Sequence, residues 1–216
     1  MKDIAIVGAG GLGREMLVML HQLNEAQPAQ WNILGFYDDD TSLAGTAINC
    51  FPYLGTITAL ASTDYELQVV IAIGNPQIKR AIVTQLELNV KISFPTLVHP
   101  QVQVKPYQHI QLGTGVVLAQ GTILTTNISI GKHVFVNLNC TIGHDAILKD
   151  FVSVMPGVNI SGAVVLETGV YVGTNAAILQ GINVGANTQI GAGAVVTKPM
   201  PAGCTAVGVP AKVVKT

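Results

Sequence analysis

Aliphatic residues recur at every sixth position through the second half of the chain. Each of these fifteen positions, from residue 112 to residue 196, is Leu, Ile or Val. They are Leu112, Leu118, Leu124, Ile130, Val136, Ile142, Leu148, Val154, Ile160, Leu166, Val172, Ile178, Val184, Ile190 and Val196. A period of six is typical of hexapeptide repeats in a parallel β-helix. The run therefore predicts between four and five coils of three hexads each.

Stacking of side chains along a solenoid is the physical basis of this prediction. An inward-pointing aliphatic residue lies over its equivalent one coil away, so the apolar core is continuous only if every coil supplies one. A β-sandwich is the alternative, but its strands alternate with a period of two and its loops vary in length. Glycines are expected at the corners, where the chain turns tightly and a Cβ would be costly. The glycines in question are Gly113, Gly131, Gly143, Gly173, Gly185 and Gly191.

The first part of the chain has a different pattern, in which short apolar runs alternate with helical stretches. Strands are predicted at residues 3–7, 33–37 and 68–73, with helices at residues 14–23 and 77–88. This alternation favours a small doubly wound α/β unit of the Rossmann type. We therefore expect two domains, a Rossmann-like domain at residues 1–97 and a β-helix at residues 98–216.

Composition and charge exclude several function classes. Charged residues make up 11% of the chain and the net charge is −1, so no basic surface is available for nucleic acid. The apolar runs are strand-sized and interrupted by glycine, which predicts neither a signal peptide nor a membrane span. The three cysteines, Cys50, Cys140 and Cys204, are odd in number and widely spaced, as expected for free thiols in the cytoplasm.

Glycines follow the first predicted strand in the pattern of a dinucleotide fingerprint, Gly8-Ala9-Gly10-Gly11-Leu12-Gly13. Backbone N–H groups at the start of a helix suit a phosphate. Asp38, which ends the second strand, occupies the place of a ribose-binding carboxylate. A nucleotide-linked sugar is the functional interpretation of the glycine motif, and a purely structural tight turn is the alternative. Asp38 and Asp39 fit a solvated turn equally well. A dehydrogenase is disfavoured because the remainder of the chain is a β-helix.

Candidate chemistry on the β-helix centres on His144. The hexad frame places it outward, beside Asp145, whose carboxylate would hold one tautomer of the imidazole. Such an imidazole can accept a proton from an attacking amine or hydroxyl. Gly162 lies one coil further on and would offer its N–H to an acyl oxygen. A surface histidine with an incidental aspartate is the alternative. His21, His99, His109 and His133 are interpreted as structural or solvated, and no metal site is expected.

Taken together, these motifs resemble the bacterial hexapeptide-repeat sugar acetyltransferases, in the branch with an N-terminal nucleotide-sugar-binding domain. This PglD/NeuD-like branch includes UDP-amino-sugar N-acetyltransferases and sialic acid O-acetyltransferases. The resemblance covers essentially the whole chain. Its carriers are the segments 8–11, 38–39, 72–75, 98–100 and 137–145, and the terminal Gly208-Val209-Pro210-Ala211-Lys212.

This resemblance implies a left-handed β-helix, a homotrimer with active sites between subunits, and acetyl-CoA as co-substrate without a metal. It further implies that His144 is the general base, that Asp145 raises its basicity and that Asn137 is an active-site residue. Gly162 matches the amide donor to the acetyl carbonyl. Acetyl-CoA contacts are implied at Ser153, Gly162, Thr174 and Ala192, and acceptor contacts at Gly10, Gly11, Leu12, Asp38, Asp39 and Gly74.

One departure concerns Leu12, because amino-sugar enzymes of this branch usually have a histidine directly after the glycine pair. We expect transfer of an acetyl group to the amino, or alternatively the hydroxyl, group of a nucleotide-activated sugar. O-acetylation of a sialic acid or other sugar is one alternative, and a non-enzymatic nucleotide-binding scaffold is another. A serine acetyltransferase would not need the α/β domain, and a β-helix carbonic anhydrase would need three histidines around zinc.

Overall fold

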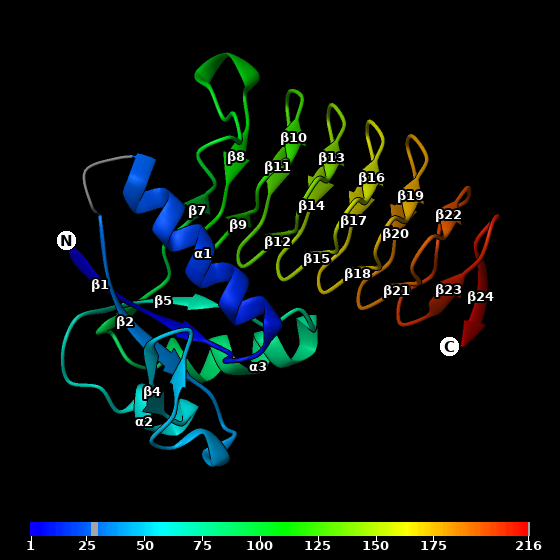
Figure 1. Ribbon diagram of the computed structural model, residues 1–216. Coiled ribbons are helices and arrows are strands. Elements are labelled where there is room, and N and C mark those ends of the chain that lie inside the picture. Colours follow the sequence, from blue (N-terminus) through cyan, green and yellow to red (C-terminus); the bar gives the residue numbers. More distant parts are fainter. Residues whose placement is uncertain (27–29, 216) are drawn as a thin grey trace. The chain divides into compact units, whose positions relative to one another are not determined.

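The computed structural model describes residues 1–26 and 30–215, and the chain forms two compact units (Figure 1). The first unit comprises Met1–Gly74 and Ile78–Pro95, and the second comprises Asn75–Gln77 and Thr96–Thr216. An α/β unit is thus followed by a β-helix, as the sequence predicts.

A six-stranded sheet with the strand order β3-β4-β2-β1-β5-β6 forms the first unit. All neighbouring strands are parallel except β3 and β4, which pair antiparallel. The central strand β1 is buried from Ile4 to Val7, as expected for a parallel strand covered on both faces. The elements are β1 (Lys2–Val7), α1 (Gly11–Ala26), β2 (Trp31–Tyr37), η1 (Thr41–Leu43), β3 (Ala47–Ile48), β4 (Phe51–Gly55), α2 (Ile57–Ala61), β5 (Leu67–Ile71), α3 (Pro76–Leu86) and β6 (Ile92–Ser93).

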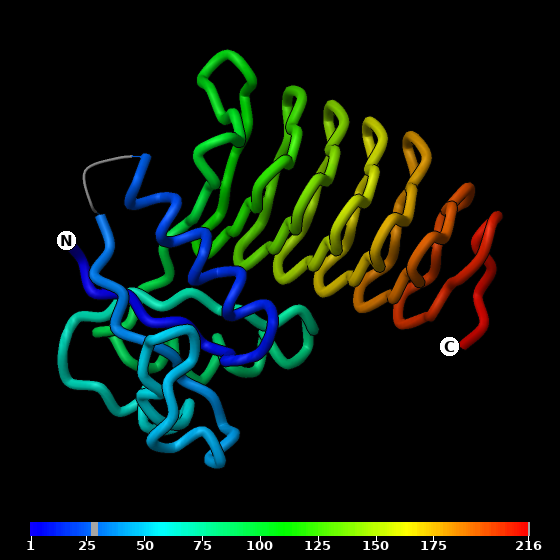
Figure 2. The backbone as a smooth tube through the Cα atoms, in the orientation of Figure 1, coloured from blue at the N-terminus to red at the C-terminus, as the bar shows by residue number. Residues whose placement is uncertain are grey.

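Three parallel sheets form the second unit, and Figure 2 shows the repeated coils of its backbone. The β12 sheet contains β7 (Leu97–Val98), β9 (Val117–Leu118), β12 (Phe135–Val136), β15 (Ser153–Val154), β18 (Tyr171–Val172), β21 (Gln189–Ile190), β23 (Thr205–Val207) and the antiparallel β24 (Lys212–Lys215). The β13 sheet contains β10 (Ile123–Leu124), β13 (Thr141–Ile142), β16 (Asn159–Ile160), β19 (Ala177–Ile178) and β22 (Val195–Val196). The β14 sheet contains β8 (Gln111–Leu112), β11 (Ser129–Ile130), β14 (Ile147–Leu148), β17 (Val165–Leu166) and β20 (Asn183–Val184), and the short helix η2 (Pro106–Gln108) precedes β8.

The register of the sheets confirms the predicted coil of eighteen residues. Thr141 pairs with Asn159 and Ile142 with Ile160, and the same offset holds in all three sheets from β8 to β22. Of the fifteen aliphatic residues, all but the half-buried Leu112 are buried. Each contributes roughly 1.5–3 kcal/mol by leaving water. Their continuous column is the core of the solenoid.

A second period of six concerns the backbone rather than the side chains. Three places before each aliphatic residue, the described chain has a positive φ, from residue 109 to residue 193. This left-handed conformation suits Gly and Asn, and it is uncommon for other residues. The residues are His109, Gly115, Gly121, Asn127, His133, Asn139, Asp145, Phe151, Gly157, Ala163, Gly169, Asn175, Gly181, Asn187 and Gly193.

Glycines that directly follow an aliphatic residue are required for a different reason, namely the close approach of the next coil. A Cβ on Gly143 would lie 2.6 Å from the backbone nitrogen of Gly162, because successive coils approach closely there. None of the six predicted corner glycines has a positive φ. The prediction that a Cβ would be costly is thus confirmed, whereas the tight backbone turn occurs two residues later.

Candidate active site

Two sets of turns in the β-helix position the predicted residues. We call the turns from the β12 sheet to the β13 sheet the first corner, which includes residues 137–140, 155–158, 173–176 and 191–194. The turns from the β13 sheet to the β14 sheet are the second corner, which includes residues 125–128, 143–146, 161–164 and 179–182.

His144 and Asp145 lie on the second corner, directly after β13. Nδ1 of His144 is 2.7 Å from Oδ2 of Asp145, and both side chains are about half exposed, at 51% and 55%. Asp145 has a φ of 59°, and its N–H donates to the carbonyl of Thr126 one coil below. The left-handed turn therefore fixes the carboxylate beside the imidazole.

Gly162 lies one coil above His144, with the imidazole against its Cα. A Cβ at Gly162 would collide with Nε2, Cε1 and Cδ2 of His144, of which the farthest is only 2.9 Å away. The buried N–H of Gly162 donates to no acceptor within the described residues. The stacking predicted from the eighteen-residue period is confirmed, and the residue that packs against the imidazole has an N–H without an acceptor among the described residues.

This arrangement is able to perform acid–base chemistry. In the neutral tautomer whose Nδ1–H donates a hydrogen bond to Asp145, Nε2 carries a lone pair and can accept a proton. The N–H of Gly162 is available to an oxygen that develops negative charge nearby. Base, orienting carboxylate and amide donor are thus present on one corner of one chain.

Cys140, four residues before His144 and on the first corner, has no part in this chemistry. Burial raises the pKa of its thiol to about 11, and its Sγ donates to the carbonyl of Met155 at 3.2 Å. A thiol with that pKa is protonated at neutral pH, whereas the thiolate is the nucleophile. We therefore expect no covalent acyl-cysteine intermediate.

The other residues predicted for catalysis or acetyl-CoA binding lie in the β12 sheet or on the first corner. Thr174 and Ala192 are exposed and stacked, and Gly193 donates to the carbonyl of Thr174. Asn137 is buried, and its Oδ1 accepts from the N–H of Leu138. Ser153, in β15, is fully buried. One chain therefore does not bring these four residues to His144, which lies across the β13 sheet.

In the first unit, the carboxyl ends of three strands bring the predicted acceptor residues together. β1 lies between β2 and β5, so the segments after Val7, Tyr37 and Ile71 are neighbours. Gly8 has a φ of 102°, and its Cβ would lie 2.8 Å from the carbonyl oxygen of Ala72. Gly10 and Gly11 are exposed with open space around them, and Leu12 and Gly74 are half-buried.

The carboxylates of this edge are already engaged locally. Asp38 accepts from the N–H of Ala9 at 2.7 Å and from the N–H of Asp40 at 3.0 Å. Asp39 accepts from the N–H of Ile57, at the start of α2, at 2.9 Å. Each ionised carboxylate has further acceptor capacity. Both carboxylates therefore hold the local backbone, and a role in acceptor binding stays a prediction.

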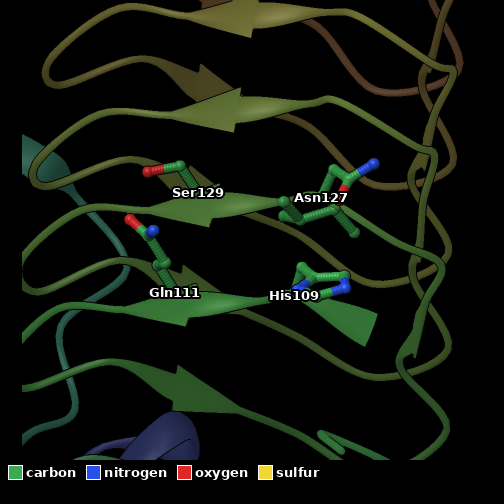
Figure 3. A pocket seen from close by; sticks show the side chains of 5 residues that line it. His109, Gln111, Asn127 and Ser129 are labelled. Carbon is green, nitrogen blue, oxygen red and sulfur yellow. The ribbon is translucent and has the colours of Figure 1, made fainter. Parts of the chain in front are cut away.

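A pocket on the β-helix was missed by the sequence interpretation (Figure 3). It has a volume of about 410 Å³ and is lined by His109, Gln111, Asn127, Ile128 and Ser129. His109 is exposed, as predicted, but it belongs to this cluster. The signal was present in the sequence, because residues 109 and 127 are 36 and 18 places before Asp145 and thus stack beneath it.

Residues 1–26 and 30–215 contain neither a candidate metal site nor a candidate membrane span. No group of three or more His, Cys, Asp or Glu side chains is placed to hold a metal ion there. Among the described helices, none is long and apolar enough to cross a membrane.

Comparisons with known proteins identify the family. Residues 3–86 match the model of the PglD N-terminal domain. The chain is 34% identical to GDP-perosamine N-acetyltransferase from Escherichia coli, over 100% of this chain and 97% of the relative. The acetyltransferase domain of PglB from Neisseria gonorrhoeae, solved with acetyl coenzyme A, is 30% identical with a TM-score of 0.87 and covers 99% of both chains.

A second solved structure, perosamine N-acetyltransferase from Caulobacter crescentus, has a TM-score of 0.88 over 100% of this chain and 98% of its own. Its identity is 24%, so it supports the fold alone. The predicted left-handed β-helix with an N-terminal α/β domain is confirmed by these structures. The chain belongs to the hexapeptide-repeat, acetyl-CoA-dependent sugar acetyltransferases that carry a PglD N-terminal domain.

Proposed function

We propose that this chain transfers an acetyl group from acetyl-CoA to the amino group of a nucleotide-linked sugar. The single observation that carries the proposal is the position of His144, which contacts the carboxylate of Asp145 and packs against Gly162, whose N–H has no acceptor among the described residues. The relative from Escherichia coli is named for N-acetylation of GDP-perosamine, and it matches along the full chain. A GDP-linked amino sugar is therefore the first acceptor to test.

In the proposed reaction, the nitrogen of the sugar amine attacks the thioester carbonyl carbon. Nε2 of His144 takes the proton that the nitrogen loses, and the imidazolium is stabilised by Asp145. The oxyanion of the tetrahedral intermediate accepts a hydrogen bond from the N–H of Gly162. The C–S bond then breaks, the proton passes from His144 to the departing sulfur, and an amide and CoA are released.

We further infer that the enzyme is a homotrimer with each site shared by two chains. The base and the amide donor lie on the second corner, whereas Asn137, Thr174 and Ala192 lie on the first corner. A site that contains both sets needs a second protomer, and a closed threefold ring provides one at every interface. Exposed apolar side chains flank the second corner, with Ile123 60% and Ile147 40% exposed. Contact with a neighbouring chain would bury them.

The donor arm of acetyl-CoA would extend toward the C-terminal coils. Thr174 and Ala192 stack along the first corner, and their exposed positions leave room for an extended chain. The nucleotide would bind to the first unit, where Gly10 and Gly11 present an open backbone at the start of α1. The three free cysteines support a reducing compartment, so we place the reaction in the cytoplasm.

CoA release tests this function directly. With acetyl-CoA and a panel of GDP-, UDP- and dTDP-linked amino sugars, we expect release with at least one of them. The same nucleotide sugar with a hydroxyl in place of the amine is the matched control, and its kcat/KM is expected to be lower by about 10-fold or more. The observation that favours the second candidate, O-acetylation, is Leu12 in place of the usual histidine. Faster release with the hydroxyl sugar or with sialic acid would establish that candidate instead, and no release with any sugar would contradict both.

A further inference from the structure

The second corner changes character at His144. Toward the C-terminus, the left-handed position is occupied by Ala163 and Gly181, and the outward position of the β14 sheet by Ile147 and Val165. Toward the N-terminus, the same left-handed position holds Asn127 and His109, and the same outward position holds Ser129 and Gln111. Over the two positions on each side of the base, small and apolar side chains thus lie toward the C-terminus and hydrogen-bonding side chains toward the N-terminus, and a polar residue, Asn183, follows further along the β14 sheet.

Those polar residues line the pocket in Figure 3. Gln111 and Ser129 project from the neighbouring strands β8 and β11, and His109 and Asn127 lie at the ends of those strands. All four are exposed, and none of their side chains forms a hydrogen bond within the described residues. An imidazole, two amides and a hydroxyl are therefore available to a ligand.

The position of the pocket relative to the base follows from the backbone. Asp145 donates to Thr126, and Asn127 donates to Gln108, so the three segments stack on successive coils. Successive strands lie about 4.8 Å apart, which places Asn127 about one strand spacing and His109 about two spacings below the His144–Asp145 pair. A sugar ring bound in the pocket would thus cover the one to two strand spacings between the pocket residues and the His144–Asp145 pair.

We propose that this pocket binds the sugar ring of the acceptor, an inference that rests on the proposed function. The donor would occupy the C-terminal side of His144, where Gly162 offers its N–H and Ala163 leaves space. The acceptor must then approach the thioester from the N-terminal side. Neutral donors and acceptors match the hydroxyl and amine groups of a sugar, and a volume of about 410 Å³ is large enough for a monosaccharide.

Paired substitutions test the pocket with matched controls. Asn127→Gly removes the amide at a left-handed position that glycine favours. Asn187→Gly makes the same change in a turn from the β14 sheet to the β12 sheet, away from the pocket. Gln111→Ala removes a second amide, and Asn183→Ala makes a comparable change further along the β14 sheet. We expect each pocket variant to raise the KM for the nucleotide amino sugar by about 5-fold, as for one lost hydrogen bond, with the KM for acetyl-CoA unchanged. Both control variants are expected to resemble the wild type.

The outcomes separate this inference from the proposed function. Active pocket variants whose acceptor KM equals that of the wild type would overturn the inference alone, as would an equal rise in the two controls. A rise in the KM for acetyl-CoA without a rise for the acceptor would also overturn it. Wild-type enzyme that releases no CoA with any nucleotide amino sugar would overturn the proposed function, and this inference with it. Thermal unfolding of each variant confirms that it is folded, and Ser129→Ala provides a smaller change in the same pocket.

Discussion

Replacement of His144 by alanine is expected to lower kcat for acetyl transfer by roughly 10²- to 10⁴-fold, which is the usual contribution of a general base. The side chain is about half exposed and its neighbour Gly162 contributes no side chain, so its removal leaves the core intact. Initial rates of CoA release, measured at saturating acetyl-CoA and acceptor, provide the test. His21→Ala, an exposed histidine in α1, is the control and is expected to retain wild-type kcat.

Asp145→Asn tests the contribution of the orienting carboxylate while the base His144 is retained. Asparagine already occupies the same left-handed position at Asn127, Asn139 and Asn175, so the backbone is expected to be unaffected. The amide cannot stabilise an imidazolium as a carboxylate does, so kcat is expected to fall by about 10-fold or more. Wild-type turnover in His144→Ala would remove His144 from the mechanism, whatever the result for Asp145→Asn.

A second large effect is expected at Gly162. Gly162→Ala places a methyl group against the imidazole of His144, and Gly162→Pro additionally removes the N–H. Loss of one amide donor to an oxyanion typically lowers kcat by about 10²- to 10³-fold. We therefore expect the proline variant to be slower than the alanine variant, since both displace the imidazole but only proline removes the donor.

The fold itself tolerates proline at this hexad position. Pro156 occupies the equivalent place one hexad earlier, and the N–H of Gly162 makes no hydrogen bond in the described structure. Thr168→Pro, one hexad later, is the matched control and is expected to keep both the thermal stability and the kcat of the wild type. Equal kcat in Gly162→Ala and Gly162→Pro would show that the N–H is not an oxyanion donor.

The β-helix was predictable because its core repeats a single physical requirement in every coil. None of the fifteen positions spaced six apart from Leu112 to Val196 is polar, and this regularity predicted the register and with it the stacking of Gly162 on His144. The left-handed backbone positions were not predicted, because they are occupied by residues as different as Gly121, Phe151 and Ala163. There the stacked coils impose the conformation, and local preference does not decide it.

The first unit was predicted only where strands and helices are long. Helix α1 begins at Gly11, three residues before the predicted start, because the backbone of the glycine segment already turns into the helix. The hairpin of β3 and β4 was missed, since Ala47–Ile48 is only two residues long and Phe51–Gly55 contains a proline. The bonds of Asp38 and Asp39 to Ala9 and Ile57 depend on tertiary packing, which a single sequence does not specify.

The candidate site was predicted residue by residue but not as an arrangement. The hexad frame placed His144 outward and Gly162 above it, as the structure shows. It did not reveal that Asn137 and Thr174 lie on the other corner, because that needs the order of the three sheets. The pocket was missed because His109 was considered alone rather than as part of the column beneath Asp145.

Sharing of each site between two chains is the central claim, and complementation tests it most directly. Co-expression of His144→Ala with Asn137→Ala, each with its own affinity tag, gives mixed oligomers that both tags retain. Their mass is expected to be about three times 22.6 kDa. Every mixed trimer joins an intact second corner to an intact first corner at one of its three interfaces, so about a third of the wild-type activity should return.

The pair His144→Ala and Gly162→Pro changes the same corner, so its mixed oligomers should recover far less activity; Ala192→Trp provides a second variant of the first corner. The account predicts strong recovery only when the two substitutions lie on different corners. Mixed trimers of His144→Ala and Asn137→Ala that stay as inactive as their parents would contradict it.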